Sequence, residues 1–239
     1  MSLNKKLLWG GLGWVFGGPI GAILGYTYAS MSNNNPQKLS GASNSTRHGD
    51  FVISVLVLFA KVMKADGKLL KSELDYIKDF LKQQFGLQKA KELMIVFRDI
   101  LEQEYPLKDV CRQIQRSMDH PSRLELIHIL YGLSASDGHV HPEEIRIIQT
   151  IANYLNINRK DYESIKAMFA KDDKAPFRVL EISPDASDQE IKRAYRKMAN
   201  KYHPDKVSHL GREMQTSAEE KFKAVNNAYQ QLKKDRNIS

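Results

Sequence analysis

The sequence contains a single cysteine, Cys111, among 239 residues. One cysteine excludes an internal disulfide framework and a cysteine-rich zinc site, and it fits a reducing compartment such as the cytoplasm. A phosphate-binding loop of the GxxxxGK type is also absent, so we do not expect the chain to bind ATP itself. Because Cys111 has no catalytic context and no Ser/His/Asp spacing stands out, we predict neither an enzyme nor a cofactor.

The composition is nevertheless that of a folded, basic protein, with 42% hydrophobic residues and a formal net charge of +8. This hydrophobic content is sufficient for one large domain or two smaller ones. The positive charge suits nucleic acid, an anionic membrane surface or an acidic protein partner, and charge alone does not choose among them.

Residues 7–29 contain no charged side chain. As a helix they would span roughly 34 Å, which is enough to cross a bilayer. We therefore predict a membrane anchor over residues 1–30 and, because the next segment is rich in Ser, Asn and Gly, a flexible linker over 31–49. A glycine at every fourth position would give the anchor a smooth face for self-association: Gly13, Gly17, Gly21 and Gly25.

Two other interpretations of this segment remain open. The first is a secretory signal peptide. The second is a soluble glycine-rich hairpin, which is favoured by Pro19 and seven glycines because these residues disfavour a helix in water.

The middle of the chain contains a repeat, in which residues 59–77 align without gaps on 130–148 at an offset of 71 residues. In each copy an apolar helix runs into Asp-Gly, and a second, amphipathic helix begins near a glutamate. The two helical hairpins, joined by a helical stretch over 88–118, predict an all-α domain with internal pseudo-symmetry over residues 50–170. This pattern resembles the TerB-like (tellurite-resistance) helical fold.

The repeat places an acidic pair in each copy, and two interpretations of these pairs are open. They are candidate ligands of a divalent cation if several carboxylates converge, and His139 and His141 lie in the second copy. Alternatively, and in our preferred interpretation, Asp-Gly ends one helix with a left-handed glycine and the glutamate complements the positive start of the next helix. The acids in question are Asp66 and Glu73 in the first copy and Asp137 and Glu144 in the second.

The C-terminal part begins after a short polar break at 171–175 with a predicted short helix at about 176–181. Ser187 and Glu190 then form a capping-box start for a second helix. Between residues 191 and 202 this helix has no acid and five cations, Lys192, Arg193, Arg196, Lys197 and Lys201. Its other face is apolar, with Ile191, Ala194, Tyr195, Met198 and Tyr202 at helical spacing.

Proline cannot continue a helix, so this helix ends near Tyr202 and the residues His203, Pro204 and Asp205 lie on a turn. After a polar loop, residues 217–234 predict a further helix, so two antiparallel helices are joined by an exposed loop.

These parts resemble the J domain of the DnaJ family, which we place at residues 171–239. The matching pieces are "FRVLEISPDAS", "EIKRAYRKMANKYHPDK" and "KFKAVNNAY". The resemblance implies a co-chaperone that stimulates ATP hydrolysis by a DnaK-type chaperone of the heat shock protein 70 class. It also implies a chaperone-binding site made of the turn His203, Pro204 and Asp205 and the helix residues Lys192, Tyr195, Arg196 and Lys197. We expect no nucleic-acid partner, because the basic helix lacks interleaved exposed aromatic residues.

The three parts together resemble the DjlA family of membrane-anchored DnaJ-like co-chaperones. This resemblance implies a single-pass protein of the inner (plasma) membrane whose C-terminal domains lie in the cytoplasm. Two features depart from related patterns: the link before the J domain is short, and the Gly/Phe-rich region and zinc module of full DnaJ are missing, so client binding of that kind is not expected. The alternative function is a metal-ion or stress-sensing TerB-like module with the J domain as its output.

Overall fold

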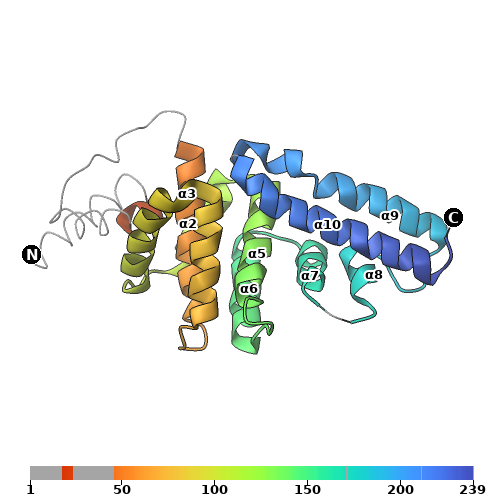
Figure 1. Cartoon of the computed structure of the whole chain (residues 1–239), viewed down its shortest axis with the longest axis horizontal. Helices are drawn as coiled ribbons and strands as arrows, with labels where there is room; N and C mark the ends of the chain where they lie inside the picture. The colour runs from red at the N-terminus through yellow and green to blue at the C-terminus, as the bar shows by residue number, and fades with distance from the viewer. Residues whose placement is uncertain (1–17, 24–45, 171, 211, 239) are drawn as a thin grey trace, which may run out of the picture. The chain divides into compact units, whose positions relative to one another are not determined.

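The structure is a computed structural model that describes residues 18–23, 46–170, 172–210 and 212–238. Within these ranges the chain forms helices and turns and no strand, which confirms the all-α prediction. The chain divides into two compact units, residues 1–117 and residues 118–239. Figure 1 shows the helices of both units. Each unit holds one copy of the repeat.

The first unit is built on α2, whose side chains from Ser54 to Ala60 are all buried. A helix that is apolar on all sides belongs inside a core, and α2 packs against α3 with Phe59 lying edge-on to Tyr76 and Phe80. The helices of this unit are α2 (Thr46–Met63), α3 (Lys71–Leu101) and α4 (Leu107–Ser117).

The helical stretch predicted for residues 88–118 is divided in the structure between α3 and α4. The division has a local cause, since Pro106 disfavours helical geometry at the residue before it. A second irregularity lies within α3, where Gly86 has a φ of 74° and separates two helical segments.

Only a small part of the predicted membrane anchor is described. Residues 18–23 are helical, Ile20 and Ile23 are buried, and the Ile20 amide donates to Gln113 Oε1 at 3.0 Å. The rest of the segment 7–29, including Gly13, Gly17 and Gly25, and residues 31–45 of the predicted linker lie outside the described residues. The last part of the linker predicted for 31–49, residues 46–49, belongs to α2. No helix within the described ranges is long and apolar enough to cross a membrane.

The second unit is centred on α5, whose side chains from Leu124 to Tyr131 are all buried. This helix packs against α6, α7, η1 and α10, so the second repeat copy shares a core with the C-terminal helices. The elements are α5 (His120–Ser134), α6 (Pro142–Tyr154), α7 (Arg159–Met168), α8 (Ala175–Val179), α9 (Asp188–Lys201), the 3-10 helix η1 (Pro204–Leu210) and α10 (Arg212–Asp235).

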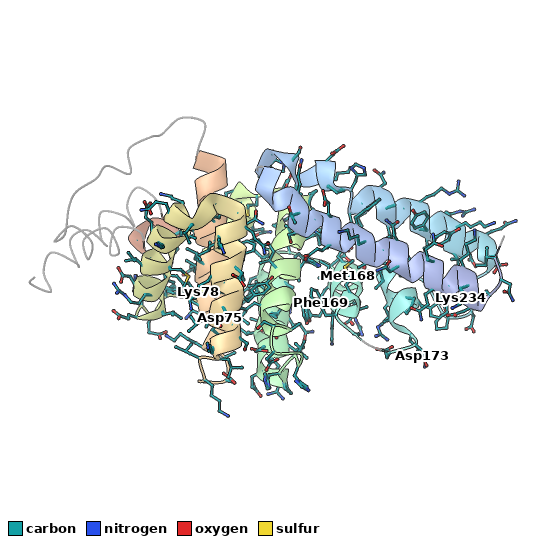
Figure 2. The ribbon with its side chains drawn as sticks, in the orientation of Figure 1. Asp75, Lys78, Met168, Phe169, Asp173 and Lys234 are labelled. Carbon is teal, nitrogen blue, oxygen red and sulfur yellow. The ribbon has the colours of Figure 1, made fainter. Side chains whose placement is uncertain are left out.

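An aromatic cluster fixes the end of α7 against α5. Phe169, labelled in Figure 2, stacks on Tyr131 with 5.6 Å between ring centroids and lies 5.1 Å from the ring of His128. The Tyr131 hydroxyl donates to the hydroxyl of Tyr162 at 2.7 Å. The core of this unit therefore contains polar atoms that are paired with one another.

The repeat predicted from the sequence is reproduced by the helix boundaries. In the first copy α2 ends at Met63 and α3 begins at Lys71, and in the second copy α5 ends at Ser134 and α6 begins at Pro142. Both boundaries are offset by the 71 residues of the sequence repeat. The predicted helical hairpins are therefore confirmed.

The C-terminal hairpin of α9 and α10 is also confirmed, and the two helices lie side by side in Figure 1. The predicted apolar face of α9 is buried at Ile191, Ala194, Met198 and Tyr202. The remaining member of that face, Tyr195, stacks on Tyr229 of α10 with 4.3 Å between ring centroids.

One difference concerns the segment after the His-Pro-Asp turn, which we predicted as a polar loop and which forms η1. Val207 and Leu210 are three residues apart and expose only 2% and 3% of their surface. Residues at this spacing eclipse in a 3-10 helix, so this conformation buries both apolar side chains together.

Candidate functional site

The candidate site is the turn at the C-terminal end of α9. The helix ends at Lys201, and the amide of Tyr202 makes the last hydrogen bond, to Met198 O at 2.9 Å. The Asp205 amide donates to His203 Nδ1 at 3.3 Å, and a carboxylate oxygen of Asp205 lies 3.5 Å from the same nitrogen. The side chains of His203 and Asp205 are 49% and 83% exposed, so a locally bonded turn displays both of them.

The buried Tyr202 and the half-buried Phe222 hold this turn in place. Tyr202 is buried and its hydroxyl donates to Ser164 Oγ of α7 at 3.4 Å. Burial raises the pKa of this hydroxyl, so it is protonated and acts as the donor. The His203 ring lies edge-on to Phe222 of α10, with 5.8 Å between centroids. The backbone of the turn is therefore anchored while its polar side chains face solvent.

The start of α5 also contacts the segment that follows the turn. His209 of η1 lies with Nε2 at 3.1 Å from Ser122 Oγ and 3.7 Å from Asp119 Oδ2. Asp119 is the N-cap of α5, where its side chain accepts from the Ser122 amide at 3.0 Å. The same residues that begin α5 thus fix the end of η1.

The predicted contact residues on the helix all lie on α9, which leads directly into the turn. Tyr195 donates to Asn226 Oδ1 of α10 at 2.9 Å, and Arg196 Nε donates to the Lys192 carbonyl at 3.3 Å. Lys197 donates to Glu181 Oε2 at 3.1 Å, while 67% of its side chain stays exposed. A role of these residues in binding a chaperone remains a prediction.

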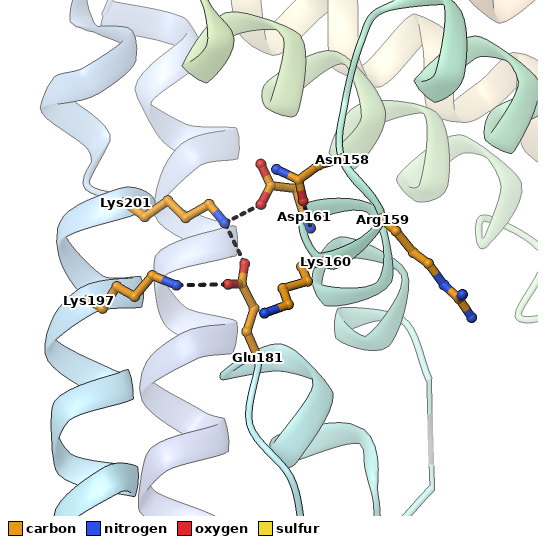
Figure 3. Close-up of a pocket in the computed structure, with 7 residues that line it drawn as sticks. All are labelled: Asn158, Arg159, Lys160, Asp161, Glu181, Lys197 and Lys201. Atoms are coloured by element: carbon orange, nitrogen blue, oxygen red, sulfur yellow. Dashed lines mark hydrogen bonds and ion pairs between the residues drawn. The ribbon is translucent and has the colours of Figure 1, made fainter.

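Next to this face is an open hollow of about 580 Å³ between α7, the end of α8 and α9, shown in Figure 3. In it Lys201 Nζ donates to Asp161 Oδ1 at 2.5 Å and to Glu181 Oε1. Its lining consists of Asn158, Arg159, Lys160, Asp161, Glu181, Lys197 and Lys201.

Asp161 is charged despite its burial. Burial raises the pKa of its carboxyl group, but the hydrogen bonds and charges of Lys201 and His120 outweigh this effect and lower the pKa overall. His120 Nε2 lies 2.7 Å from Asp161 Oδ2. The carboxylate therefore joins α5, α7 and α9 through two basic partners.

A second buried ion pair links α10 to α5, where Lys221 Nζ lies 2.5 Å from Glu125 Oε2. Ser217 Oγ of α10 donates to the other oxygen of Glu125 at 2.5 Å. Together with Lys201, these contacts attach the C-terminal hairpin to α5 and α7.

The sequence analysis missed Asp161, Glu181 and Glu125 as partners of the C-terminal helices. Asp161 carried one local signal, since Asn158 three residues earlier accepts from its amide at 3.0 Å and caps α7. That pattern predicts a helix start and says nothing of Lys201, which is 40 residues away.

The repeated acids act as turn and cap residues. Asp66 and Asp137 each accept from the amide two residues later, at 2.9 and 2.8 Å. Glu73 accepts from the Leu70 amide at 2.9 Å, and Glu144 accepts from the His141 amide at 3.1 Å and from Ser134 Oγ. In the part of the chain that the structure describes, no three His, Cys, Asp or Glu side chains are grouped to hold a metal ion.

Comparisons with known proteins agree with these two regions. Residues 52–167 match the family model of the tellurite resistance protein TerB, and residues 175–239 match the DnaJ domain. The co-chaperone protein DjlA of Vibrio cholerae is 27% identical, with 83% of this chain and 82% of that protein covered.

Two further relatives carry the same name. DjlA of Shewanella oneidensis is 28% identical over 84% of this chain and 83% of that protein, and DjlA of Coxiella burnetii is 23% identical over 100% of both. No solved structure matches the chain.

Proposed function

The chain is a DjlA-type protein, a TerB domain followed by a DnaJ domain, and we propose that it stimulates the ATPase of a DnaK-type chaperone at the cytoplasmic face of the membrane. The observation that carries the proposal is the exposed pair His203 and Asp205 at the end of the basic helix α9. In this proposal the partner hydrolyses the ATP, and the chain is an activator rather than an enzyme.

The geometry supports this proposal in two ways. The cations of α9 attract an acidic groove, which accelerates encounter and fixes the register of the complex more than it adds affinity. The turn is held by Tyr202 and Phe222, so little conformational freedom is lost when it binds.

The test is single-turnover ATP hydrolysis by a cognate DnaK-type chaperone in the presence of the full chain. We expect His203→Gln to abolish the stimulation and to leave the circular dichroism spectrum unchanged, because the imidazole is half exposed and the substitution removes only its local polar contacts and its edge-on contact with Phe222. His139→Gln is the matched control, since His139 is an exposed histidine of a loop in the other domain. Equal stimulation by His203→Gln and the unsubstituted chain would reject the site.

The membrane part of the proposal rests on the uncharged residues 7–29. Fractionation of cells is expected to place the chain with the membranes, and a product found wholly in the soluble fraction contradicts the anchor. We further propose that anchors associate through their glycine face, so Gly17→Leu should reduce cross-linking between copies.

A further inference from the structure

The hollow beside α9 contains more cations than acids. Arg159, Lys160, Lys197 and Lys201 line it together with Asp161 and Glu181. In Figure 3 the side chain of Lys160 extends from α7 toward Glu181, where Lys197 and Lys201 also reach, and Arg159 points away from this group. Lys160 of the TerB domain and Lys197 of the J domain therefore line the same hollow.

The two acids of this hollow already have partners. Lys201 joins Asp161 to Glu181, and Lys197 donates to the second oxygen of Glu181. Both carboxylate side chains are only 5% exposed. The negative charge is thus neutralised and covered.

Two cations at the edge of the hollow, Lys160 and Lys197, are accessible to solvent and are called the rim below. Lys197 is 67% exposed although it is paired. Lys160 is exposed, and among the described residues its side chain makes no hydrogen bond or ion pair. What the rim presents to solvent is therefore positive charge that comes from two domains.

This positive rim is continuous with the predicted chaperone-binding face, because Lys197 belongs to both. The position of Lys160 beside it is fixed by contacts between α7 and the J domain. Ser164 Oγ donates to the Val179 carbonyl at 2.8 Å and accepts from the Tyr202 hydroxyl. Lys160 thus stays next to Lys197 without a flexible linker between them.

We propose that the chaperone-binding surface extends from α9 onto the first turn of α7, where Lys160 contacts the acidic surface of the same DnaK-type chaperone. The inference rests on the proposed function and adds a contact outside the J domain. An acidic surface of the partner that binds Lys192, Arg196 and Lys197 would lie beside Lys160, whose charge has no partner among the residues that the structure describes. At physiological salt, charges attract one another over about 8 Å, so Lys160 would contribute to binding the same surface.

The test measures ATPase stimulation as a function of the concentration of the full chain. Lys160→Glu is expected to raise the concentration for half-maximal stimulation about three- to tenfold and to leave the maximal rate unchanged, because it weakens docking and not the trigger. The shift should shrink at high salt, and Lys160→Arg should restore the unsubstituted value. Lys160→Ala, which adds no repulsion, should give a smaller shift in the same direction.

Lys82→Glu is the matched control, since Lys82 is an exposed helical lysine of the first unit and the net charge changes equally. An equal shift with this control, or no shift with Lys160→Glu, overturns the inference; if His203→Gln still abolishes stimulation, the proposed function stands. If Lys160→Glu weakens binding to vesicles of anionic phospholipid and leaves the ATPase curve unchanged, the rim serves a membrane and the inference is wrong. A full chain that does not stimulate the chaperone at all overturns both proposals.

Discussion

Lys221 of α10 and Glu125 of α5 form an ion pair with 2.5 Å between Nζ and Oε2, although the two side chains expose only 3% and 0% of their surface. Burial raises the pKa of Glu125, but the charge of Lys221 and the hydrogen bonds from Lys221 and Ser217 outweigh it and lower the pKa overall. The pair joins the J domain to the TerB domain. Its contribution to stability depends on both partners being present.

We expect Lys221→Met to destabilise the chain by about 3–5 kcal/mol, because it leaves the Glu125 carboxylate buried without a cation. The double variant Glu125→Leu/Lys221→Met should recover most of this loss, since an apolar pair of similar volume replaces a buried ion pair at little cost. Urea unfolding followed by circular dichroism measures both. A double variant as unstable as the single one would show that the loss comes from packing and not from the unpaired charge.

His128 lies beside this pair and makes stability depend on pH. Burial lowers its pKa to about 3, an effect opposed by the charge of Glu125 and reinforced by that of Lys221. The unfolded chain takes up this proton near the usual value of 6.5, and the folded chain does not. The contribution of His128 is therefore complete above pH 6.5 and decreases as the pH falls toward 3.

The measurement compares the unsubstituted chain with His128→Leu by urea unfolding at about pH 7 and pH 5. Acidification should lower the free energy of unfolding of the unsubstituted chain more than that of the variant. The groups that also titrate near this position are Glu125 and Glu220, and both are present in both proteins. If the difference between the two proteins is the same at both pH values, His128 is not the cause.

The two turns of the repeat depend on glycine. Gly67 and Gly138 have φ values of 75° and 89°, in the left-handed region that the Asp-Gly pattern predicted. A Cβ at either position would meet no atom within 4 Å. Substitution by alanine should therefore lower the free energy of unfolding by about 1–2 kcal/mol at each turn, which is the cost of the left-handed backbone conformation for a residue with a Cβ. Asparagine should lower it less, because asparagine tolerates this conformation. Thermal unfolding of the four single variants tests this, and alanine and asparagine of equal stability would contradict it.

Much of the fold follows from local patterns in the sequence. The helical hairpins, the left-handed glycines and the cap at Ser187, whose Oγ accepts from the Glu190 amide at 3.4 Å, are all set by residues a few positions apart. Periodicity also identified the buried side of α9, since one helix face repeats every three to four residues.

The attachment of the J domain to the TerB domain was not predictable in this way. In the sequence Lys201 is one of five cations on the basic face of a helix, which predicts an exposed side chain. In the structure its side chain is only 21% exposed and lies between Asp161 and Glu181. These partners are 40 and 20 residues away, and no helical period relates them. Likewise η1 follows from the burial of Val207 and Leu210, which depends on helices that the local sequence does not specify.

The link through Lys201 has a consequence for the thermodynamics of association. Lys201 of α9 pairs with Asp161 of α7 and with Glu181 after α8. These ion pairs hold the exposed surfaces of α7 and α9 in a fixed position relative to each other. A partner that touches both loses its translational and rotational freedom once, and a second contact adds its free energy without a further entropic cost.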